Sequence, residues 1–215
     1  MNTLNYIYLH GFASSPKSAK AQYLANRIEL SIPDLNRGDF THLTLTRQLE
    51  QVADRSLKSS ASVNLIGSSF GGLTAAWLAE KYDKIDRLIL LAPAFNFLSH
   101  WLPKLGRKQL QQWQETGYLS VYHYGESTLL PLHYQFILDL EGYREEKLQK
   151  PIPTLIFHGV DDDVIPIDSS REYAATRPWV QLIELKDDHS LIKTMPQIWQ
   201  AIRDFGQIPH FPKEN

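Results

Sequence analysis

The chain has 215 residues, of which 43% are hydrophobic and 11% aromatic, and its formal net charge is −2. This composition is typical of a globular domain, and no charge run or basic patch favours binding to nucleic acid or to an acidic membrane surface. The absence of cysteine excludes disulfides, thiolate catalysis and cysteine metal sites. No stretch approaches 18 consecutive apolar residues, so we expect no membrane span.

The length predicts a single domain over residues 1–215 that carries one sizeable insertion. The first residues lack a basic region followed by an apolar run and a small-residue cleavage site, and a core strand is predicted from residue 5. We therefore expect a cytoplasmic location.

Six short segments rich in β-branched, aromatic or other apolar residues are predicted to be strands, and most of them alternate with segments of helical periodicity. The predicted strands are 5–9, 28–32, 62–66, 85–91, 152–158 and 179–185. The predicted helices are 17–27, 45–57, 73–80, 168–176 and 195–205. Nearly continuous apolar runs are expected of a parallel sheet covered on both faces. Ligands of such sheets bind beyond the carboxyl ends of the strands, so functional residues should follow strand ends.

The pentapeptide Gly67-Ser68-Ser69-Phe70-Gly71 lies between a predicted strand and a predicted helix. In this context a G-x-S-x-G pattern indicates a nucleophile elbow, a tight turn that exposes the central hydroxyl. Glycine is needed two residues to either side, because a side chain there would collide with the turn or with the next strand. The pattern therefore predicts Ser69 as the nucleophile, and Ser68 is not a candidate because glycines do not flank it at this spacing.

Three further chemical groups follow the ends of other predicted strands. The acids at 161–163 follow the strand ending at residue 158, His189 follows the strand ending at 185, and the Gly11-Phe12 turn follows the strand ending at 9. A serine hydroxyl needs a base to take its proton, and the base needs an acid to orient it. We therefore expect His189 to act as the base and one of the three aspartates as the acid, in the chain order Ser, Asp, His.

The tetrahedral intermediate of such a reaction needs fixed hydrogen-bond donors for its oxyanion. The backbone N–H groups of Phe12 and Phe70 are the candidates, because one follows the first strand and the other follows the nucleophile.

Four stretches of the chain resemble the α/β-hydrolase superfamily, at residues 8–12, 67–72, 158–166 and 188–190. Within that superfamily, Leu-His-Gly-Phe at 9–12 followed by Ser-Ser-Pro-x-Ser-x-Lys at 14–20 is similar to the small bacterial YqiA/YcfP-type esterases. The resemblance implies an α/β-hydrolase fold: a three-layer sandwich with a six-stranded, mainly parallel sheet and a helical cap. The family pattern H-G-x-x-D-x-x-V-P implies that the acid is Asp162, with Asp161 and Asp163 as alternatives.

Residues 93–150 interrupt the alternation of strands and helices, at a place where this superfamily often carries a cap. We predict two or three short helices over the strand ends. The segment is unusually aromatic, and a subset of its aromatic side chains is expected to line an apolar pocket beside Ser69. The candidates are Phe95, Phe97, Trp101, Trp113 and Tyr134.

His10 and His158 each precede a glycine at a predicted strand end, and we expect them to be structural residues that form local hydrogen bonds. The sequence contains no H-E-x-x-H or close histidine pair, and Gly71-Gly72 belongs to no nucleotide-binding loop. We therefore expect no metal and no cofactor.

These features together predict a serine hydrolase that cleaves a small-molecule carboxylic ester or thioester through an acyl-enzyme. The alternatives are a peptidase or acyltransferase that uses the same triad, or a catalytically silent hydrolase-fold binding module. A dehalogenase is disfavoured because it would need a carboxylate at position 69. The sequence makes no prediction about the oligomeric state.

Overall fold

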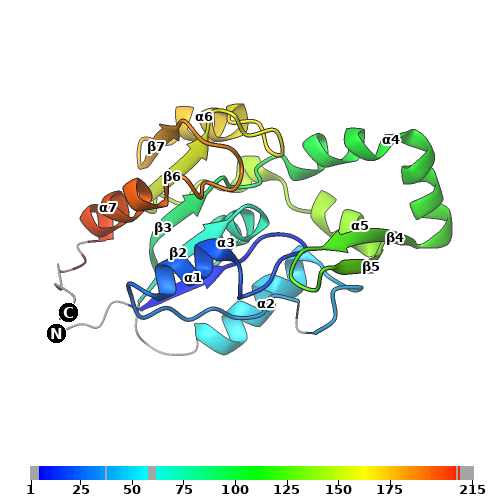
Figure 1. Ribbon diagram of the computed structural model, residues 1–215, viewed down its shortest axis with the longest axis horizontal. Coiled ribbons are helices and arrows are strands. Elements are labelled where there is room, and N and C mark those ends of the chain that lie inside the picture. Colours follow the sequence, from blue (N-terminus) through cyan, green and yellow to red (C-terminus); the bar gives the residue numbers. More distant parts are fainter. Residues whose placement is uncertain (1–4, 37, 58–61, 207, 209–215) are drawn as a thin grey trace.

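The computed structural model describes residues 5–36, 38–57, 62–206 and 208. A five-stranded parallel sheet forms its centre, in the order β1-β2-β3-β6-β7 (Figure 1). The strands are β1 (Tyr6–Leu9), β2 (Val63–Ser68), β3 (Ile85–Leu91), β6 (Thr154–Gly159) and β7 (Val180–Leu185). Their carboxyl ends therefore meet at one edge of the sheet.

The prediction of a six-stranded sheet is wrong by one strand. The backbone of segment 28–32 pairs with β1 at a single residue, Ser31. The Ser31 N–H donates to the carbonyl of Tyr6 at 3.0 Å, and the Ser31 carbonyl accepts from the Tyr8 N–H at 2.8 Å. Pro33 has no N–H and cannot provide the next donor of a ladder. The pairing of this apolar segment therefore stops at an isolated bridge on the edge of the sheet.

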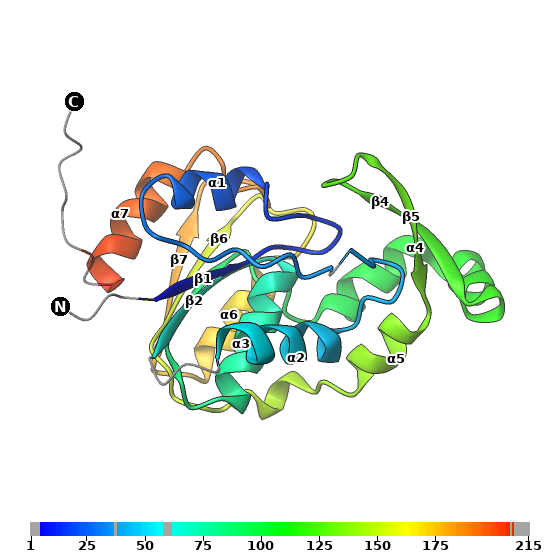
Figure 2. The ribbon, with the colours of Figure 1, turned by 90° about the horizontal axis from the view of Figure 1, so that it is seen from below.

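Helices cover both faces of the sheet, as Figure 2 shows. α1 (Ala19–Ala25) and α7 (Met195–Gly206) lie on one face, whereas α2 (Leu45–Ser56), α3 (Phe70–Lys81) and α6 (Asp168–Ala175) lie on the other. Successive strand side chains alternate between the faces, so Ile7 and Leu9 pack with the second group of helices while Tyr6 and Tyr8 pack with the first. The result is the predicted three-layer sandwich.

α3 is the central helix of its layer and is buried from Phe70 to Ala79. It contacts β1, β2, β3 and α2. A helix that is apolar all round belongs in the interior, and the small residues on α3 let its first turn approach the sheet closely. The position of the residue before it, Ser69, is thereby fixed relative to three strands.

The insertion between β3 and β6 contains an antiparallel hairpin as well as helices. Its elements are α4 (Phe97–Thr116), β4 (Tyr118–His123), β5 (Thr128–His133), α5 (Gln135–Glu141) and the 3-10 helix η1 (Glu145–Lys147). Two or three short helices were expected, so the hairpin is a correction. The β-branched and aromatic residues of 118–124 favour a strand, and the paired segment keeps Leu119 and Leu132 opposite each other in the core.

α4 is two helical segments joined at Gly106, whose φ of 75° departs from helical geometry. It ends at Gly117, which has a φ of 80°. Both angles lie in the left-handed region that glycine adopts most readily. The two glycines thus let α4 bend and then turn into β4, at the end of the molecule that lies beyond the carboxyl ends of the strands (Figure 1).

Within the residues that the structure describes, no helix has both the length and the apolar character needed to span a membrane.

The start of α2 provides a test of the fold. The Thr44 hydroxyl accepts a hydrogen bond from the Arg47 N–H at 3.1 Å and caps this helix. We expect Thr44→Ala to lower the free energy of unfolding by about 1 kcal/mol, measured from urea denaturation curves. Thr44→Ser keeps the hydroxyl and is the matched control, and an equal loss in both variants would contradict the capping role.

Candidate active site

Ser69 occupies a strained turn between β2 and α3. Its φ of 53° and ψ of −121° are rare for a residue with a side chain. Backbone hydrogen bonds hold this conformation: the Ser69 N–H donates to Leu91 at 2.9 Å, and its carbonyl accepts from Gly72 at 2.8 Å and from Ala94 at 3.0 Å. The neighbouring strand and the first turn of α3 therefore determine the direction of the Ser69 side chain.

The two glycines of the pentapeptide sit where no side chain fits. A Cβ atom at Gly67 would overlap the backbone of Gly71 and Gly72, and one at Gly71 would overlap the backbone of Leu9 and His10. Glycine is therefore required at both positions, because the turn folds back on itself and contacts the end of β1.

A chain of hydrogen bonds joins the three predicted triad residues. His189 Nε2 lies 3.1 Å from Ser69 Oγ, and His189 Nδ1 lies 2.7 Å from Asp162 Oδ2. The three residues follow the ends of β2, β6 and β7. The sheet therefore brings together groups that are 120 and 27 positions apart in the sequence.

Asp162 is buried, whereas its neighbours Asp161 and Asp163 are exposed. Its Oδ1 accepts the backbone N–H groups of Val164 and Ile165, both at 2.9 Å. Burial raises the pKa of this carboxyl, but hydrogen bonds from His158 and His189 outweigh burial and hold the pKa well below its usual range. Asp162 is consequently an anion at neutral pH.

His158 is a second partner of this carboxylate. Its Nε2 lies 2.9 Å from the carbonyl of Ile165 and 3.1 Å from Asp162 Oδ2, and its Nδ1 lies 2.8 Å from Ser170 Oγ. Because a carbonyl only accepts, we assign the proton to Nε2, so that His158 donates toward Asp162.

The sequence indicated a structural role for His158 and did not indicate its contact with the acid. The signal was its position at the end of a strand, four residues before Asp162. His10 fits the structural interpretation, because its Nε2 accepts from the Leu35 N–H at 3.0 Å.

The two expected oxyanion donors belong to Phe12 and Phe70, which adjoin Gly11 and Ser69 in the chain. The backbone of Gly11 approaches Ser69 so closely that a Cβ at position 11 would lie 3.3 Å from Ser69 Cβ. Phe12 follows it, and Phe70 is the first residue of α3. Across the described part of the chain, neither the Phe12 N–H nor the Phe70 N–H donates a hydrogen bond.

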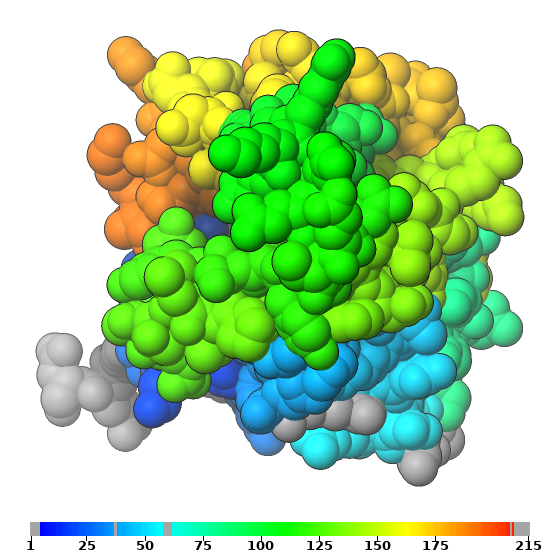
Figure 3. All heavy atoms as spheres, turned by 90° about the vertical axis from the view of Figure 1, so that its right-hand side faces the viewer, coloured from blue at the N-terminus to red at the C-terminus, as the bar shows by residue number. Residues whose placement is uncertain are grey.

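A cavity of about 560 Å³ opens beside Ser69 and His189. In Figure 3, blue residues of the N-terminal part are visible at the bottom of a hollow between the orange, yellow and green surfaces. Of the five aromatic candidates from the insertion, Phe97 and Trp101 line this cavity. Other residues of its wall were not predicted from the sequence. They come from β1, from the start of α1, from β4 and the turn after it, and from the loops after β6 and β7: Tyr8, Ser18, Lys20, Val121, Tyr122, Tyr124, Val164 and Ile192.

The other three aromatic candidates lie elsewhere, which corrects the prediction. Trp113 is buried within the insertion, where its indole N–H donates to the carbonyl of Leu132 and its ring packs edge-on against Tyr134. Phe95 stacks on Tyr173 of α6, with ring centroids 4.0 Å apart. These side chains hold the insertion together and attach it to the sandwich.

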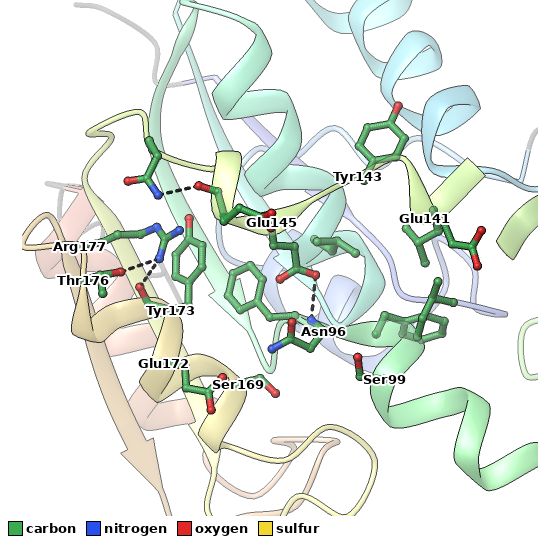
Figure 4. Close-up of a pocket in the computed structure, with 17 residues that line it drawn as sticks. Asn96, Ser99, Glu141, Tyr143, Glu145, Ser169, Glu172, Tyr173, Thr176 and Arg177 are labelled. Carbon is green, nitrogen blue, oxygen red and sulfur yellow. Dashed lines mark hydrogen bonds between the residues drawn. The ribbon is translucent and has the colours of Figure 1, made fainter. Parts of the chain in front are cut away.

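Phe95 belongs to a second cavity, of about 510 Å³, that no triad residue lines (Figure 4). On one side of it the Glu145 carboxylate accepts the Asn96 N–H at 2.8 Å, and Tyr173 and Arg177 lie on the α6 side. Burial raises the pKa of Glu145 to about 7, despite the opposing effects of this hydrogen bond and of Arg177. The bond between Asn96 and Glu145 joins the two ends of the insertion.

Among the residues that the structure describes, no three histidine, aspartate or glutamate side chains are arranged to hold a metal ion.

Residues 5–206 match the model of the Uncharacterised protein family (UPF0227). The chain belongs to this family. The match covers most of the chain and confirms the resemblance to the YqiA/YcfP-type proteins that the motifs indicated.

Solved structures of hydrolases share the fold of this UPF0227 chain. Est1E from Butyrivibrio proteoclasticus, in a structure with ferulic acid bound, is 20% identical, with a TM-score of 0.75 over 95% of this chain and 88% of that one. Mouse alpha/beta hydrolase domain-containing protein 10 is 18% identical, with a TM-score of 0.73 over 96% and 90% of the two chains. The pyrethroid hydrolase PytH is 22% identical, with a TM-score of 0.64 over 97% and 99%.

The packing of the elbow gives a test of the site. We expect Gly67→Ala to lower the free energy of unfolding by about 3 kcal/mol or more, because the new methyl group meets backbone rather than a movable side chain. Gly106→Ala is the comparison: nothing lies within 4 Å of its Cβ, so only the backbone strain at φ 75° is added, about 1–2 kcal/mol. Chemical denaturation measures both, and a smaller loss at Gly67 than at Gly106 would refute the steric argument.

Proposed function

We propose that this protein is a serine hydrolase that cleaves carboxylic esters or thioesters through an acyl-enzyme. The observation that carries the proposal is the hydrogen-bonded chain from Asp162 through His189 to Ser69, with distances of 2.7 and 3.1 Å. The 3.1 Å distance allows Ser69 to transfer its proton to His189, and the 2.7 Å distance allows Asp162 to hold the imidazole by a hydrogen bond.

In the proposed first step, Ser69 Oγ attacks the substrate carbonyl and His189 Nε2 takes its proton. Asp162 accepts the Nδ1–H of His189, which keeps Nε2 free to act as the base, and its negative charge stabilises the imidazolium that forms. Because the pKa of Asp162 is held well below its usual range, the carboxylate remains ionised throughout the pH range in which His189 works.

The oxyanion of the tetrahedral intermediate would accept the N–H groups of Phe12 and Phe70. His189 then returns its proton to the leaving oxygen or sulfur, which departs and leaves the acyl group on Ser69. In the second half of the reaction His189 takes a proton from a water molecule, which attacks the acyl carbon. The bond between this carbon and Ser69 Oγ then breaks, His189 returns the proton to Oγ, and the acid is released. A peptidase or acyltransferase would use the same groups with a different leaving group or acceptor.

The cavity favours an ester or thioester with an apolar portion. Phe97 and Trp101 form part of the wall beside the nucleophile, which suits an acyl or aryl group better than a peptide backbone with several polar groups. Est1E has been solved with ferulic acid bound, and PytH is named a pyrethroid hydrolase. These properties belong to those two proteins, and they support small organic esters as the first substrates to assay on this one.

Active-site labelling tests the proposed nucleophile. A fluorophosphonate probe should label the wild-type protein and fail to label Ser69→Ala, and hydrolysis of 4-nitrophenyl acyl esters and acyl thioesters should fall about 10⁴-fold or more in that variant. Absence of labelling in the wild type would support a silent binding module instead.

The adjacent aspartates offer a matched pair for the acid. We expect Asp162→Asn to lower kcat about 10³–10⁴-fold, because an amide can hold His189 in the wrong tautomer. Asp163→Asn removes the charge of an exposed neighbour and should change kcat less than about twofold. Steady-state kinetics with one activated ester measures both, and equal losses would argue against Asp162 as the acid.

A further inference from the structure

The proposed reaction gives no role to Lys20, although Lys20 lines the same cavity as Ser69 and His189. It is the last residue of the Ser-Ser-Pro-x-Ser-x-Lys motif, and it lies at the start of α1. Its Nζ donates to the carbonyl of His189 at 3.3 Å. In the described residues this is the single hydrogen bond of an ammonium group that has three N–H donors.

Lys20 forms no direct ion pair with a carboxylate of the described residues. The acids that influence it are Asp162, Asp188 and Asp187, and across the described ranges none has a carboxylate oxygen within 4.0 Å of Nζ. Each of these acids is hydrogen-bonded elsewhere. Asp162 binds the two histidines and two backbone N–H groups, while Asp188 accepts from Ser190 at 2.8 Å.

Asp187 is engaged in the same way. It accepts the backbone N–H and the hydroxyl of Thr194, at 3.0 and 2.9 Å. Lys20 is partly buried, and partial burial of an ammonium without an ion-pair partner has a cost. Its place beside Ser69 therefore favours a partner that arrives with the substrate.

Two unpaired hydroxyl groups belong to the same cavity. Tyr8 is completely buried and Ser18 partly so, both line the cavity, and the oxygen atoms of both are buried without a hydrogen-bond partner. Burial raises the pKa of Tyr8 to about 12; the hydroxyls of Ser68 and Ser18 beside it oppose the rise, but neither meets the phenol in hydrogen-bond geometry. Both hydroxyls are therefore neutral donors at physiological pH.

We propose that Lys20, Ser18 and Tyr8 form a subsite that binds a carboxylate group carried by the substrate. The inference rests on the proposed esterase function and deepens it. The substrate would be amphipathic, with an apolar portion against Phe97 and Trp101 and a carboxylate at Lys20, which line the same cavity.

A carboxylate fits this subsite better than a phosphate group. One ammonium neutralises one negative charge, and two hydroxyls add neutral donors to the same pair of oxygen atoms. A phosphate monoester carries a charge close to −2 at neutral pH, which would leave one charge uncompensated near Asp162, Asp187 and Asp188.

The subsite should lose its charge at mildly alkaline pH. Burial lowers the pKa of Lys20 to about 8, despite the opposing attraction of Asp162, Asp188 and Asp187. The ammonium therefore predominates below about pH 8 and the neutral amine above it. The backbone carbonyl of His189 also faces Lys20, but His189 acts on both members of a substrate pair, so its contribution cancels when their rates are compared.

The experiment compares two pairs of activated esters. In one pair the acyl chain ends in a carboxylate or in the matching carboxamide, as in the 4-nitrophenyl monoesters of glutaric acid and of its amide. In the other pair the leaving group is a 4-carboxyphenol or a 4-carbamoylphenol. The ratio of kcat/KM for carboxylate over carboxamide is measured in the wild type, in Lys20→Met, Lys20→Arg and Tyr8→Phe, and in Lys17→Met.

We expect a wild-type ratio well above one for one of the two pairs, and that pair identifies the side of the ester that carries the carboxylate. Lys20→Met should reduce the ratio about tenfold or more, because it removes a charge-assisted hydrogen bond. Tyr8→Phe should reduce it about threefold. Lys20→Arg should retain most of the ratio. Lys17→Met alters an exposed lysine outside the cavity and should leave the ratio unchanged.

In the wild type the ratio should fall as the pH rises through about 8.

A purely structural role for Lys20 would lower both members of a pair equally, and an unchanged ratio in Lys20→Met would overturn the proposal. A wild-type ratio near one in both pairs would also overturn it. Absence of turnover for every ester together with absence of fluorophosphonate labelling would instead reject the proposed function. The subsite is then tested by calorimetric titration of Ser69→Ala with glutarate and with glutaramide, where equal or absent binding of the two would exclude a carboxylate site.

Discussion

The close approach of the Ser69 turn to the end of β1 is the contact on which the remainder of the site depends. Gly71 packs directly against the backbone of Leu9 and His10, and Gly11 packs against Ser69 itself. This contact leaves no room for side chains, so it fixes the distance between Ser69 and the Gly11-Phe12 loop. The strained backbone of Ser69 is tolerated because hydrogen bonds from β3 and α3 determine it from both sides.

The second determining feature is the number of donors around the Asp162 carboxylate. Two backbone N–H groups and two imidazoles are directed at its two oxygen atoms. Only His189 among these four is also in contact with Ser69. His158 and the backbone donors thus hold the acid ionised and in place, so that its position does not depend on His189 alone. Such support around a functional group improves the precision of its geometry.

Much of this arrangement could be predicted from the sequence because it follows strand ends and fixed spacings. The bounds of β3 agree with the prediction, and His189 and Ser69 lie within hydrogen-bonding distance, as their positions after strand ends suggested. Three features depend on long-range packing. Apolarity in 28–32 did not show that Pro33 ends the pairing, and Gly125 alone did not identify the hairpin at 118–133. Of the two cavities, Phe95 lines the second, whereas Phe97 lines both. Lys20 stood in a recognised motif, but its place in the cavity beside Ser69 becomes visible only in the fold.

The bond between Glu145 and Asn96 bears on how proteins with this scaffold can diversify. The insertion leaves the sandwich just after β3 and returns just before β6, and these two strands are direct neighbours, with Leu88 opposite Thr154. A segment whose two stems are fastened side by side can be lengthened, shortened or replaced without shifting the register of any strand. The wall of the catalytic cavity that comes from this segment can therefore change as a module, while the hydrogen-bonded chain at the strand ends stays as it is.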